Sequence, residues 1–324
     1  MQVNRPSEQI SVWVITEGMA GTENQCLGVA QALGVTPTVK RIALRQPWKS
    51  LSPYLGFECA CTFTPRLEGP WPDVVLASGR KSIAASRYIK KASGGKSLTV
   101  QIQDPRISPR HFDIVAVPAH DPTRGDNVIV TDGAPNRITA DGLATAKDQF
   151  APLFESMPSP RLAVLIGGSS KAHTMTPKIA TKLGRQLAGL SRDEGASLMI
   201  TASRRTDEIS MRALRDELSG LENVFIWDGQ GDNPYHGMLA WADTILVTAD
   251  SVSMISDAGT TGKPVYMVPL QGGSKRFERF YEGLREKGVL RPFAGRLEHW
   301  TYPPLNAAGQ IAAQILKTLG QRQK

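Results

Sequence analysis

The feature that most restricts the fold of this chain is an alternation of short apolar runs with longer amphipathic segments. The clearest runs are SVWVIT (11–16), DVVLA (73–77), LAVLI (162–166), SLMITAS (197–203) and DTILVTAD (243–250). Short runs of this kind are typical of strands buried on both faces, and strands that alternate with helices form parallel sheets. The pattern predicts an α/β fold of the doubly wound kind.

The length of 324 residues predicts two domains, because a single hydrophobic core rarely serves more than about 250–300 residues. The segment FAPLFESMPSPR (150–161) contains three prolines and precedes a fresh apolar run. We interpret residues 148–160 as an interdomain linker. The prediction is two Rossmann-like domains facing across a cleft, at residues 1–150 and 151–324. The last amphipathic segment, near 307–319, is left free to pack back on the first domain.

The charge of the chain is basic but not concentrated. Lys and Arg number 38 against 30 Asp and Glu, a formal net charge of +8, and each half of the sequence carries an excess of four. No polybasic run and no nucleic-acid recognition motif accompanies this charge, so nucleic acid is not an expected partner. A basic surface does attract other anions, including nucleotides and acidic lipid headgroups.

Cysteine and histidine give no sign of a metal centre. Cys26, Cys59 and Cys61 form an odd set, which argues against a disulfide framework or a structural zinc site. The five histidines stand apart in the sequence, so no metal is expected. There is no signal peptide and no apolar stretch long enough to span a membrane, so we expect a cytoplasmic protein. The basic charge and the aromatic-basic segment 275–281 leave open a peripheral contact at the inner face of the membrane.

Ligands of open α/β sheets bind beyond the carboxyl ends of the strands, so the loops after the apolar runs are the candidate sites. Gly167-Gly168-Ser169-Ser170 follows the run 162–166. Glycines let the backbone approach an anion and serines add hydroxyl donors, so this loop is a candidate phosphate cradle. It is neither a Walker nor a G-x-G-x-x-G motif. The alternative is a plain tight turn.

Two further polar loops follow later runs. Ser203, Arg204 and Arg205 leave the run 197–203, and an arginine pair can clamp a diphosphate. The alternative is a solvated cluster with the acidic residues that follow.

The third loop, at 250–253, precedes a short predicted helix. Ser251 and Ser253 are placed to cap this helix and to present hydroxyls and amides to an anion. Asp257, further along the helix, suits the two hydroxyls of a ribose. The alternative is an ordinary N-cap followed by a surface carboxylate.

The row of three loops resembles the nucleotide-sugar-binding half of GT-B glycosyltransferases. The segment WADTILVTADSVSMISDAGTTGKPVYMVPL is similar to the sugar-donor-binding segment of cell-envelope members such as the peptidoglycan N-acetylglucosaminyltransferase. The resemblance implies that Asp257 holds the ribose. Asp250-Ser251 stands where those enzymes usually have Ser-Gly.

The chain more closely resembles bacterial relatives of the plant mitochondrial-fission factor "elongated mitochondria". The segments that carry this resemblance include EGMAGTENQCLGVAQALG, SGRKSIAASRYIKK, QIQDPR, VTDGAPNRI and TADSVSMISDAGTTGKPV, and together they reach from about residue 12 to 290. The resemblance implies a family and a GT-B-like fold, and says less about the reaction.

The loop 17–25 lies where related transferases bind the acceptor. Glu17 is the first candidate for a general base that deprotonates an acceptor hydroxyl, and Glu23 the second, with helix capping the favoured role for Glu23. Asp104, at the end of a predicted strand, is a further catalytic candidate or a turn starter. Arg80 and Lys81 are either ligands of an anionic acceptor, such as a lipid-linked phosphate, or solvated residues.

These observations lead to three functional hypotheses. The first is a metal-independent glycosyltransferase that moves a sugar from a nucleoside-diphosphate donor to an unknown acceptor hydroxyl, with no cofactor besides that donor substrate. The second is a non-catalytic adaptor on a GT-B-like scaffold, related to membranes or division. The third is a sugar-nucleotide epimerase, since such enzymes share this fold.

Overall fold

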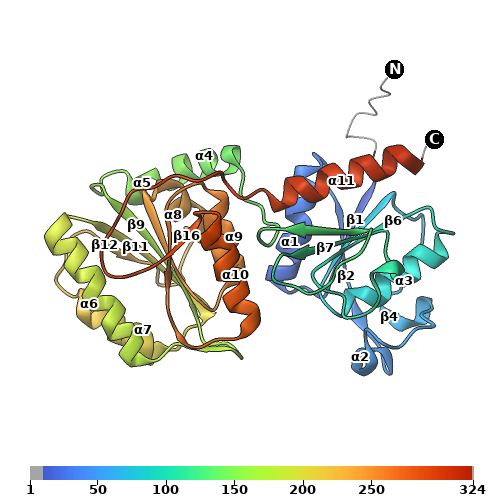
Figure 1. Cartoon of the computed structure of the whole chain (residues 1–324), viewed down its shortest axis with the longest axis horizontal. Coiled ribbons are helices and arrows are strands. Elements are labelled where there is room, and N and C mark those ends of the chain that lie inside the picture. Colours follow the sequence, from blue (N-terminus) through green and yellow to red (C-terminus); the bar gives the residue numbers. More distant parts are fainter. Residues whose placement is uncertain (1–9, 323–324) are drawn as a thin grey trace, which may run out of the picture. The chain divides into compact units, whose positions relative to one another are not determined.

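The structure is a computed structural model, and it describes residues 10–322. The chain divides into two compact units (Figure 1). Unit 1 comprises the chain up to Arg137 together with the part from Asn306 onward, and unit 2 comprises Ile138–Leu305. The boundary thus lies earlier than the 150/151 limit of the sequence analysis. Within residues 10–322, no helix is both long and apolar enough to cross a membrane.

Unit 1 is built on a six-stranded parallel sheet in the order β2-β1-β5-β6-β7-β8. Four of these strands are buried along their whole length, because both faces of the sheet are covered. Helix α11 packs on α1, and its Ile311 and Ile315 share one core with Val29. The elements are β1 (Val12–Thr16), α1 (Ala20–Ala32), β2 (Thr38–Arg41), β5 (Val74–Ser78), α3 (Ser82–Ala92), β6 (Leu98–Ile102), β7 (Ile114–Pro118), β8 (Val128–Thr131) and α11 (Ala307–Arg322).

A small excursion leaves unit 1 between β2 and β5. It contains a two-stranded antiparallel hairpin of β3 (Ala43–Leu44) and β4 (Phe63–Thr64), with the short helix α2 (Trp48–Leu51) and a 3-10 turn (Ala60–Thr62) between them. Cys59 and Cys61 are joined by a single local disulfide, which the sequence analysis did not predict, and Cys26 is a buried free thiol.

Unit 2 has a second six-stranded parallel sheet, in the order β12-β11-β9-β13-β14-β16. Helices α6 and α7 pack against each other, and α4 packs on α8. The elements are α4 (Ala140–Gln149), α5 (Ala151–Phe154), β9 (Arg161–Gly168), β10 (His173–Thr174), α6 (Pro177–Glu194), β11 (Ser197–Arg205), α7 (Glu208–Leu218), β12 (Val224–Ile226), α8 (Tyr235–Trp241), β13 (Thr244–Thr248), α9 (Val252–Thr260), β14 (Val265–Val268), β15 (Gln271–Gly272), α10 (Lys275–Glu286) and β16 (Leu290–Pro292).

The proline-rich segment 148–160 is part of unit 2. Phe150 and Phe154 are buried in the core of this unit, at the end of α4 and on α5, and Phe154 contacts Phe225 edge-on. Apolar side chains in the segment therefore override the linker signal that its prolines give.

Both sheets are doubly wound, as the sequence predicts. The strand order reverses between β1 and β5 in unit 1, and between β9 and β13 in unit 2. At such a switch point the loops after the two central strands diverge to opposite faces, which leaves a crevice at the carboxyl ends of the strands. Each unit therefore has one topologically favoured ligand position.

Candidate functional site

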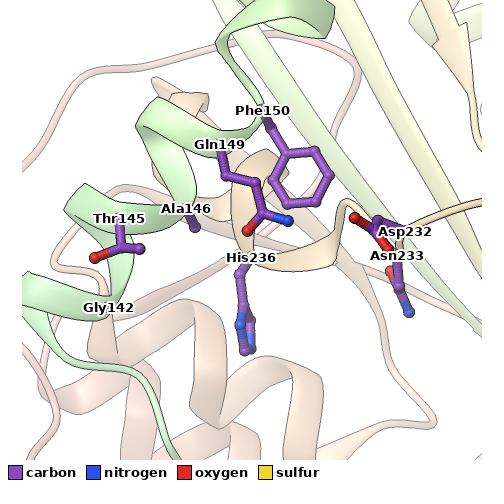
Figure 2. Close-up of a pocket in the computed structure, with 8 residues that line it drawn as sticks. All are labelled: Gly142, Thr145, Ala146, Gln149, Phe150, Asp232, Asn233 and His236. Carbon is purple, nitrogen blue, oxygen red and sulfur yellow. The ribbon is translucent and has the colours of Figure 1, made fainter.

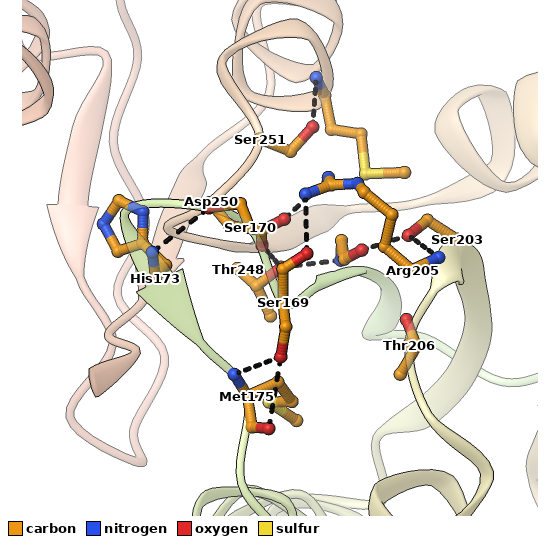
Figure 3. A network of polar contacts seen from close by, with 12 residues as sticks. Ser169, Ser170, His173, Met175, Ser203, Arg205, Thr206, Thr248, Asp250 and Ser251 are labelled. Atoms are coloured by element: carbon orange, nitrogen blue, oxygen red, sulfur yellow. Dashed lines mark hydrogen bonds and ion pairs between the residues drawn. The ribbon is translucent and has the colours of Figure 1, made fainter. Parts of the chain in front are cut away.

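The switch point of unit 2 is closed by a short chain of hydrogen bonds between the ends of β9 and β13 (Figure 3). The backbone N–H of Gly167 donates to Thr248 Oγ1 at 2.7 Å, and that hydroxyl donates to Asp250 Oδ1 at 2.7 Å. A Cβ on Gly167 would lie 2.4 Å from both carboxylate oxygens of Asp250. Only glycine fits here, because the buried carboxylate rests directly against the backbone.

The end of β11 approaches the same point. Gly168 has a φ of +94°, and a Cβ on it would lie 2.5 Å from the carbonyl carbon of Arg205. Ser203 Oγ donates to the carbonyl of Gly167 and accepts from the N–H of Arg205 at 3.1 Å. The three loops that the sequence analysis selected therefore converge on one position.

Arg205 and Asp250 form the central ion pair of this position. Arg205 Nη2 lies 2.7 Å from Asp250 Oδ2, and Arg205 Nη1 donates to the carbonyl of Ser169 at 3.3 Å. The side chain of Asp250 is fully buried, whereas that of Arg205 is 43% exposed. Burial raises the pKa of Asp250, although the hydrogen bond from Thr248 and the charge of Arg205 act in the opposite direction. Both terminal nitrogens of the guanidinium are thus held by protein, while much of the Arg205 side chain stays exposed.

The serine hydroxyls of the loops serve the backbone. Ser169 Oγ accepts from Met175 N at 3.1 Å, Ser170 Oγ accepts from His173 N at 3.1 Å, and Ser251 Oγ caps α9 by accepting from Met254 N at 3.3 Å. The tight-turn and N-cap alternatives describe these local roles. The first two N–H groups of α9 have no acceptor within the helix and stay available to an anion.

Two residues of the predicted set lie outside this network. Arg204 is exposed and forms neither a hydrogen bond nor an ion pair with the part of the chain that the structure describes. Ser253 is exposed on the first turn of α9. Successive side chains at the end of a strand point to opposite faces, which separates Arg204 from Arg205.

His173 packs between the hydrogen-bond network and helix α10. It is buried, contacts the ring of Phe277 edge-on, and lies 3.2 Å from Tyr281 Oη through Nε2. Since Tyr281 Oη donates to the carbonyl of Ala249 at 2.5 Å, it accepts from a protonated Nε2. Burial lowers the pKa of His173, which the charge of Asp250 partly opposes. Of the aromatic residues in 275–281, Phe280 and Tyr281 are buried in the core, and Phe277 is partly buried against it.

Asp257 lies on the same helix that Ser251 caps. Its Oδ2 accepts from Tyr235 Oη at 2.8 Å, and burial raises the pKa of Asp257 to about 7. Tyr235 begins α8, and the sequence analysis did not select it, although Pro234 marks this helix start.

A pocket of about 480 Å³ lies between α4 and the start of α8 (Figure 2). Its lining combines hydroxyl, amide, carboxylate and imidazole groups with one aromatic ring, and consists of Gly142, Thr145, Ala146, Gln149, Phe150, Asp232, Asn233 and His236. No motif in the sequence links α4 to α8, so sequence reasoning missed this pocket.

At the switch point of unit 1, Glu17 follows β1 and Lys81 follows β5. Glu17 Oε1 lies 2.8 Å from Lys81 Nζ. Glu23 instead pairs with Arg41 at 2.6 Å, and the hydrogen bond from Arg41 lowers the pKa of Glu23. Helix α1 starts after Met19 without a side-chain cap, so Glu23 does not have the capping role favoured above, and its lowered pKa does not suit a general base.

Asp104 organises its own turn. Its Oδ1 accepts from Arg106 N at 2.9 Å and from Thr123 Oγ1 at 2.7 Å. Gln103 and Arg106 on either side have φ values of 74° and 58°. Left-handed backbone at residues other than glycine is strained, and such residues gather at functional sites.

Gln25 is a residue that sequence reasoning missed. It is only 6% exposed, and its Oε1 accepts from Ser78 Oγ at 2.9 Å and from Gln103 Nε2 at 3.0 Å. Its own amide N–H groups make no hydrogen bond with the described residues, which leaves a fixed donor at the carboxyl edge of the unit 1 sheet.

Two doubly wound parallel sheets, each with a polar switch point, define an α/β protein of the GT-B type. The chain belongs to the mitochondrial fission ELM1 family, whose sequence profile matches residues 20–319. It is 30% identical to the Arabidopsis thaliana mitochondrial fission protein ELM1, over 95% of this chain and 91% of that protein. It is 27% identical to the uncharacterized protein RP120 of Rickettsia prowazekii (strain Madrid E), over 95% of this chain and 98% of that protein.

Solved structures agree on the fold. The UDP-GlcNAc 2-epimerase of Methanocaldococcus jannaschii superposes with a TM-score of 0.56 at 12% identity, covering 96% of this chain and all of that one. A UDP-N-acetylglucosamine 2-epimerase described as putative, from Listeria monocytogenes, gives 0.55 at 14%, covering 97% and 89%. At these identities the likeness establishes the GT-B-like fold that the sequence predicts.

Proposed function

We propose that unit 2 binds a nucleoside-diphosphate sugar beyond β9, β11 and β13, and that the protein transfers the sugar to an acceptor hydroxyl. The observation that carries this proposal is Arg205, a half-exposed guanidinium held at the switch point by Asp250 and by the carbonyl of Ser169. A UDP-GlcNAc 2-epimerase from Neisseria meningitidis, with a TM-score of 0.50 at 16% identity, was solved bound to UDP-GlcNAc, which supports this ligand class.

In this proposal each part of the donor has its own binding groups. The diphosphate lies against the exposed face of Arg205 and the first amides of α9, where guanidinium and helix dipole both favour negative charge. The ribose hydroxyls donate to Asp257, whose carboxylate Tyr235 orients at 2.8 Å. The backbone of Gly167 to Ser170 and the side chain of Ser203 shape the floor of the cradle.

The transfer step needs a base and a stabilised leaving group, and no metal. The acceptor oxygen bonds to the anomeric carbon while the bond from that carbon to the diphosphate oxygen breaks, and the diphosphate leaves with its charge against Arg205. Glu17 takes the acceptor proton, and Lys81, 2.8 Å away, orients its carboxylate. Asp104 is the second candidate base, with Oδ1 already accepting two hydrogen bonds.

Titration calorimetry with uridine, guanosine, cytidine and thymidine diphosphates tests the proposal. We expect one of them to bind, and Arg205→Lys to weaken binding by about tenfold, because lysine cannot reproduce the planar guanidinium. Arg204→Lys is the matched control, since Arg204 is exposed and outside the network. Absence of binding by the folded protein at millimolar ligand, or equal losses in both variants, contradicts the proposal.

A second candidate is sugar-nucleotide epimerisation, favoured by the epimerases among the similar structures. Product analysis by NMR separates the two reactions, because epimerisation proceeds without an acceptor and transfer does not.

A non-catalytic adaptor is the third candidate, favoured by a cradle whose Arg205 is already paired with Asp250. Here, pull-down partners that survive Arg205→Lys and Asp257→Ala support the adaptor over either enzyme.

A further inference from the structure

Exposed apolar side chains gather at one place on unit 1. Leu51, Tyr54 and Phe57 are 52%, 70% and 93% exposed. Within the described residues these are three of eight exposed large hydrophobic side chains, and the other five are scattered through the sequence. Single exposed apolar residues are common, but a local group of them marks an interaction surface. We refer to these three residues as the apolar tip.

Side chains of unit 1 hold the backbone of the apolar tip in place through hydrogen bonds and an ion pair. Trp48 Nε1 donates to the carbonyl of Gly56 at 3.0 Å. Arg87 Nη2 donates to the carbonyl of Leu55 at 2.6 Å and forms an ion pair with Glu58. The segment is therefore fixed while its apolar side chains face solvent, and the exposure is not explained by a loose loop.

Phe57 adds an independent sign of function. It has a φ of 60°, in the left-handed region that a bulky side chain rarely occupies. At 93% exposure its ring gains little from packing within the chain. Packing within the chain does not compensate for the backbone strain at Phe57. We infer that the ring contacts another surface, and that this contact compensates for the strain.

The charges around the apolar tip are positive. Arg45 and Lys49 are exposed, and no Asp or Glu occurs between Arg41 and Phe57. Ser52 Oγ donates to the carbonyl of Arg80 at 3.1 Å, which brings the exposed Arg80 beside the same turn. The nearby Glu58 is neutralised by Arg87. We refer to Arg45, Lys49 and Arg80 as the basic rim.

We propose that unit 1 docks on an anionic lipid surface through the apolar tip and the basic rim. Aromatic and leucine side chains enter the interfacial region of a bilayer, while the basic side chains stay with the negative headgroups. A segment that hydrogen bonds hold in place, with exposed apolar side chains next to exposed cations, matches the chemistry of an anionic bilayer surface, which takes up apolar and basic groups side by side. This inference does not depend on nucleotide binding in unit 2.

Vesicle co-sedimentation of the full chain tests it. We expect the protein to bind vesicles of phosphatidylcholine mixed with phosphatidylglycerol, and to bind vesicles of phosphatidylcholine alone at least about tenfold more weakly. The double variant Tyr54→Ser/Phe57→Ser loses most of this binding, and Lys49→Glu reduces it. Ile209→Ser is the matched control, because Ile209 on α7 is 70% exposed, as Tyr54 is, and lies in unit 2.

Three results overturn the proposal. One is no sedimentation of the wild-type protein with anionic vesicles, and another is equal binding by the double variant and the Ile209→Ser control. The third is self-association that Tyr54→Ser/Phe57→Ser abolishes without any vesicle binding, which assigns the tip to a second copy of the chain. All the altered side chains are exposed, so circular dichroism should report an unchanged fold for each variant.

Discussion

The two switch points have the same topology but treat their polar groups differently. In unit 2 the helices α6, α7 and α9 begin with the side-chain caps Thr176, Asp207 and Ser251. In unit 1 the helices α1 and α3 begin after Met19 and Lys81 with no side-chain cap. A side-chain cap thus satisfies one first-turn amide in each of these unit 2 helices and leaves the first two N–H groups of α9 open, whereas the first turns of α1 and α3 receive no side-chain cap.

The charged pairs differ in the same way. Asp250 is fully buried against Arg205, whereas Glu17 and Lys81 are both partly exposed. A buried pair fixes geometry but makes a ligand compete with an internal carboxylate. An exposed pair yields easily to an incoming ligand. The comparison indicates that the switch point of unit 2 is preorganised and that of unit 1 adaptable.

The largest effect is expected from Gly167→Ala. The added Cβ meets both oxygens of Asp250 at 2.4 Å, so we expect unit 2 to lose about 3 kcal/mol or more of unfolding free energy. Urea denaturation measures it. Gly21→Ala on α1 is the control, since nothing lies within 4 Å of its Cβ position. The double variant Gly167→Ala/Asp250→Ala should recover part of the loss, and an unchanged midpoint for Gly167→Ala would refute the close packing.

Asp257→Asn should change how the stability of unit 2 depends on pH. Burial raises the pKa of Asp257 to about 7, above its unfolded value, so the charged form is disfavoured in the folded state. The wild type then loses stability as pH rises toward and through about 7, and the Asp257→Asn variant does not. At pH values above about 7, we expect the free energy of unfolding of the variant to exceed that of the wild type by about 2 kcal/mol. The measurement is the melting temperature of both proteins at a series of pH values from 5 to 8. The same pH dependence of the melting temperature in the two proteins would disprove the prediction.

Asp250→Asn should strengthen the binding of a nucleoside diphosphate. Removal of the competing carboxylate frees Arg205, and we expect roughly tenfold higher affinity at neutral pH. Because burial raises the pKa of Asp250, wild-type affinity should rise as pH falls, and that of the variant should not. Asp216→Asn, an exposed change on α7, is the control for net charge. Weaker binding by Asp250→Asn would make Asp250 a ligand-holding group instead.

The smallest effects concern the helix caps. Ser251→Ala should weaken α9 by about 1 kcal/mol, and Met19→Ser should strengthen α1 by about 0.5–1 kcal/mol, since Met19 already has extended backbone angles. Native-state hydrogen exchange of the first-turn amides in α9 and α1 resolves the two. If both substitutions change helix stability in the same direction, the difference in capping between the two units does not affect their stability.

The fold was predictable because buried strands and their loops leave local signals. The loops of unit 2 were predictable for the same reason, since Gly167, Ser203 and Ser251 each stand at the end of an apolar run. Long-range partners left no such signal. Neither the pairing of Arg205 with Asp250 nor that of Tyr235 with Asp257 follows from spacing, because strand order decides which loops meet.

The remaining differences have physical causes as well. Gln25 was missed because an amide in the middle of a helix has no motif, and its hydrogen-bond partners are distant in sequence: Ser78 at the end of β5 and Gln103 just after β6. The domain boundary predicted near residue 150 lies too far along the chain, because the prolines of this segment resemble a linker. In the structure Phe150 and Phe154 of the same segment are buried in the core of unit 2.

Helix α11 has a consequence for the order in which the molecule is made. Its Ile311, Ala312 and Ile315 complete the core of unit 1, yet they follow unit 2 in the chain. During synthesis on the ribosome, unit 2 is a continuous stretch that has every residue of its own core once Leu305 has emerged. Part of the unit 1 core stays uncovered until α11 has been synthesised. Unit 1 therefore begins translation first but completes its folding after unit 2.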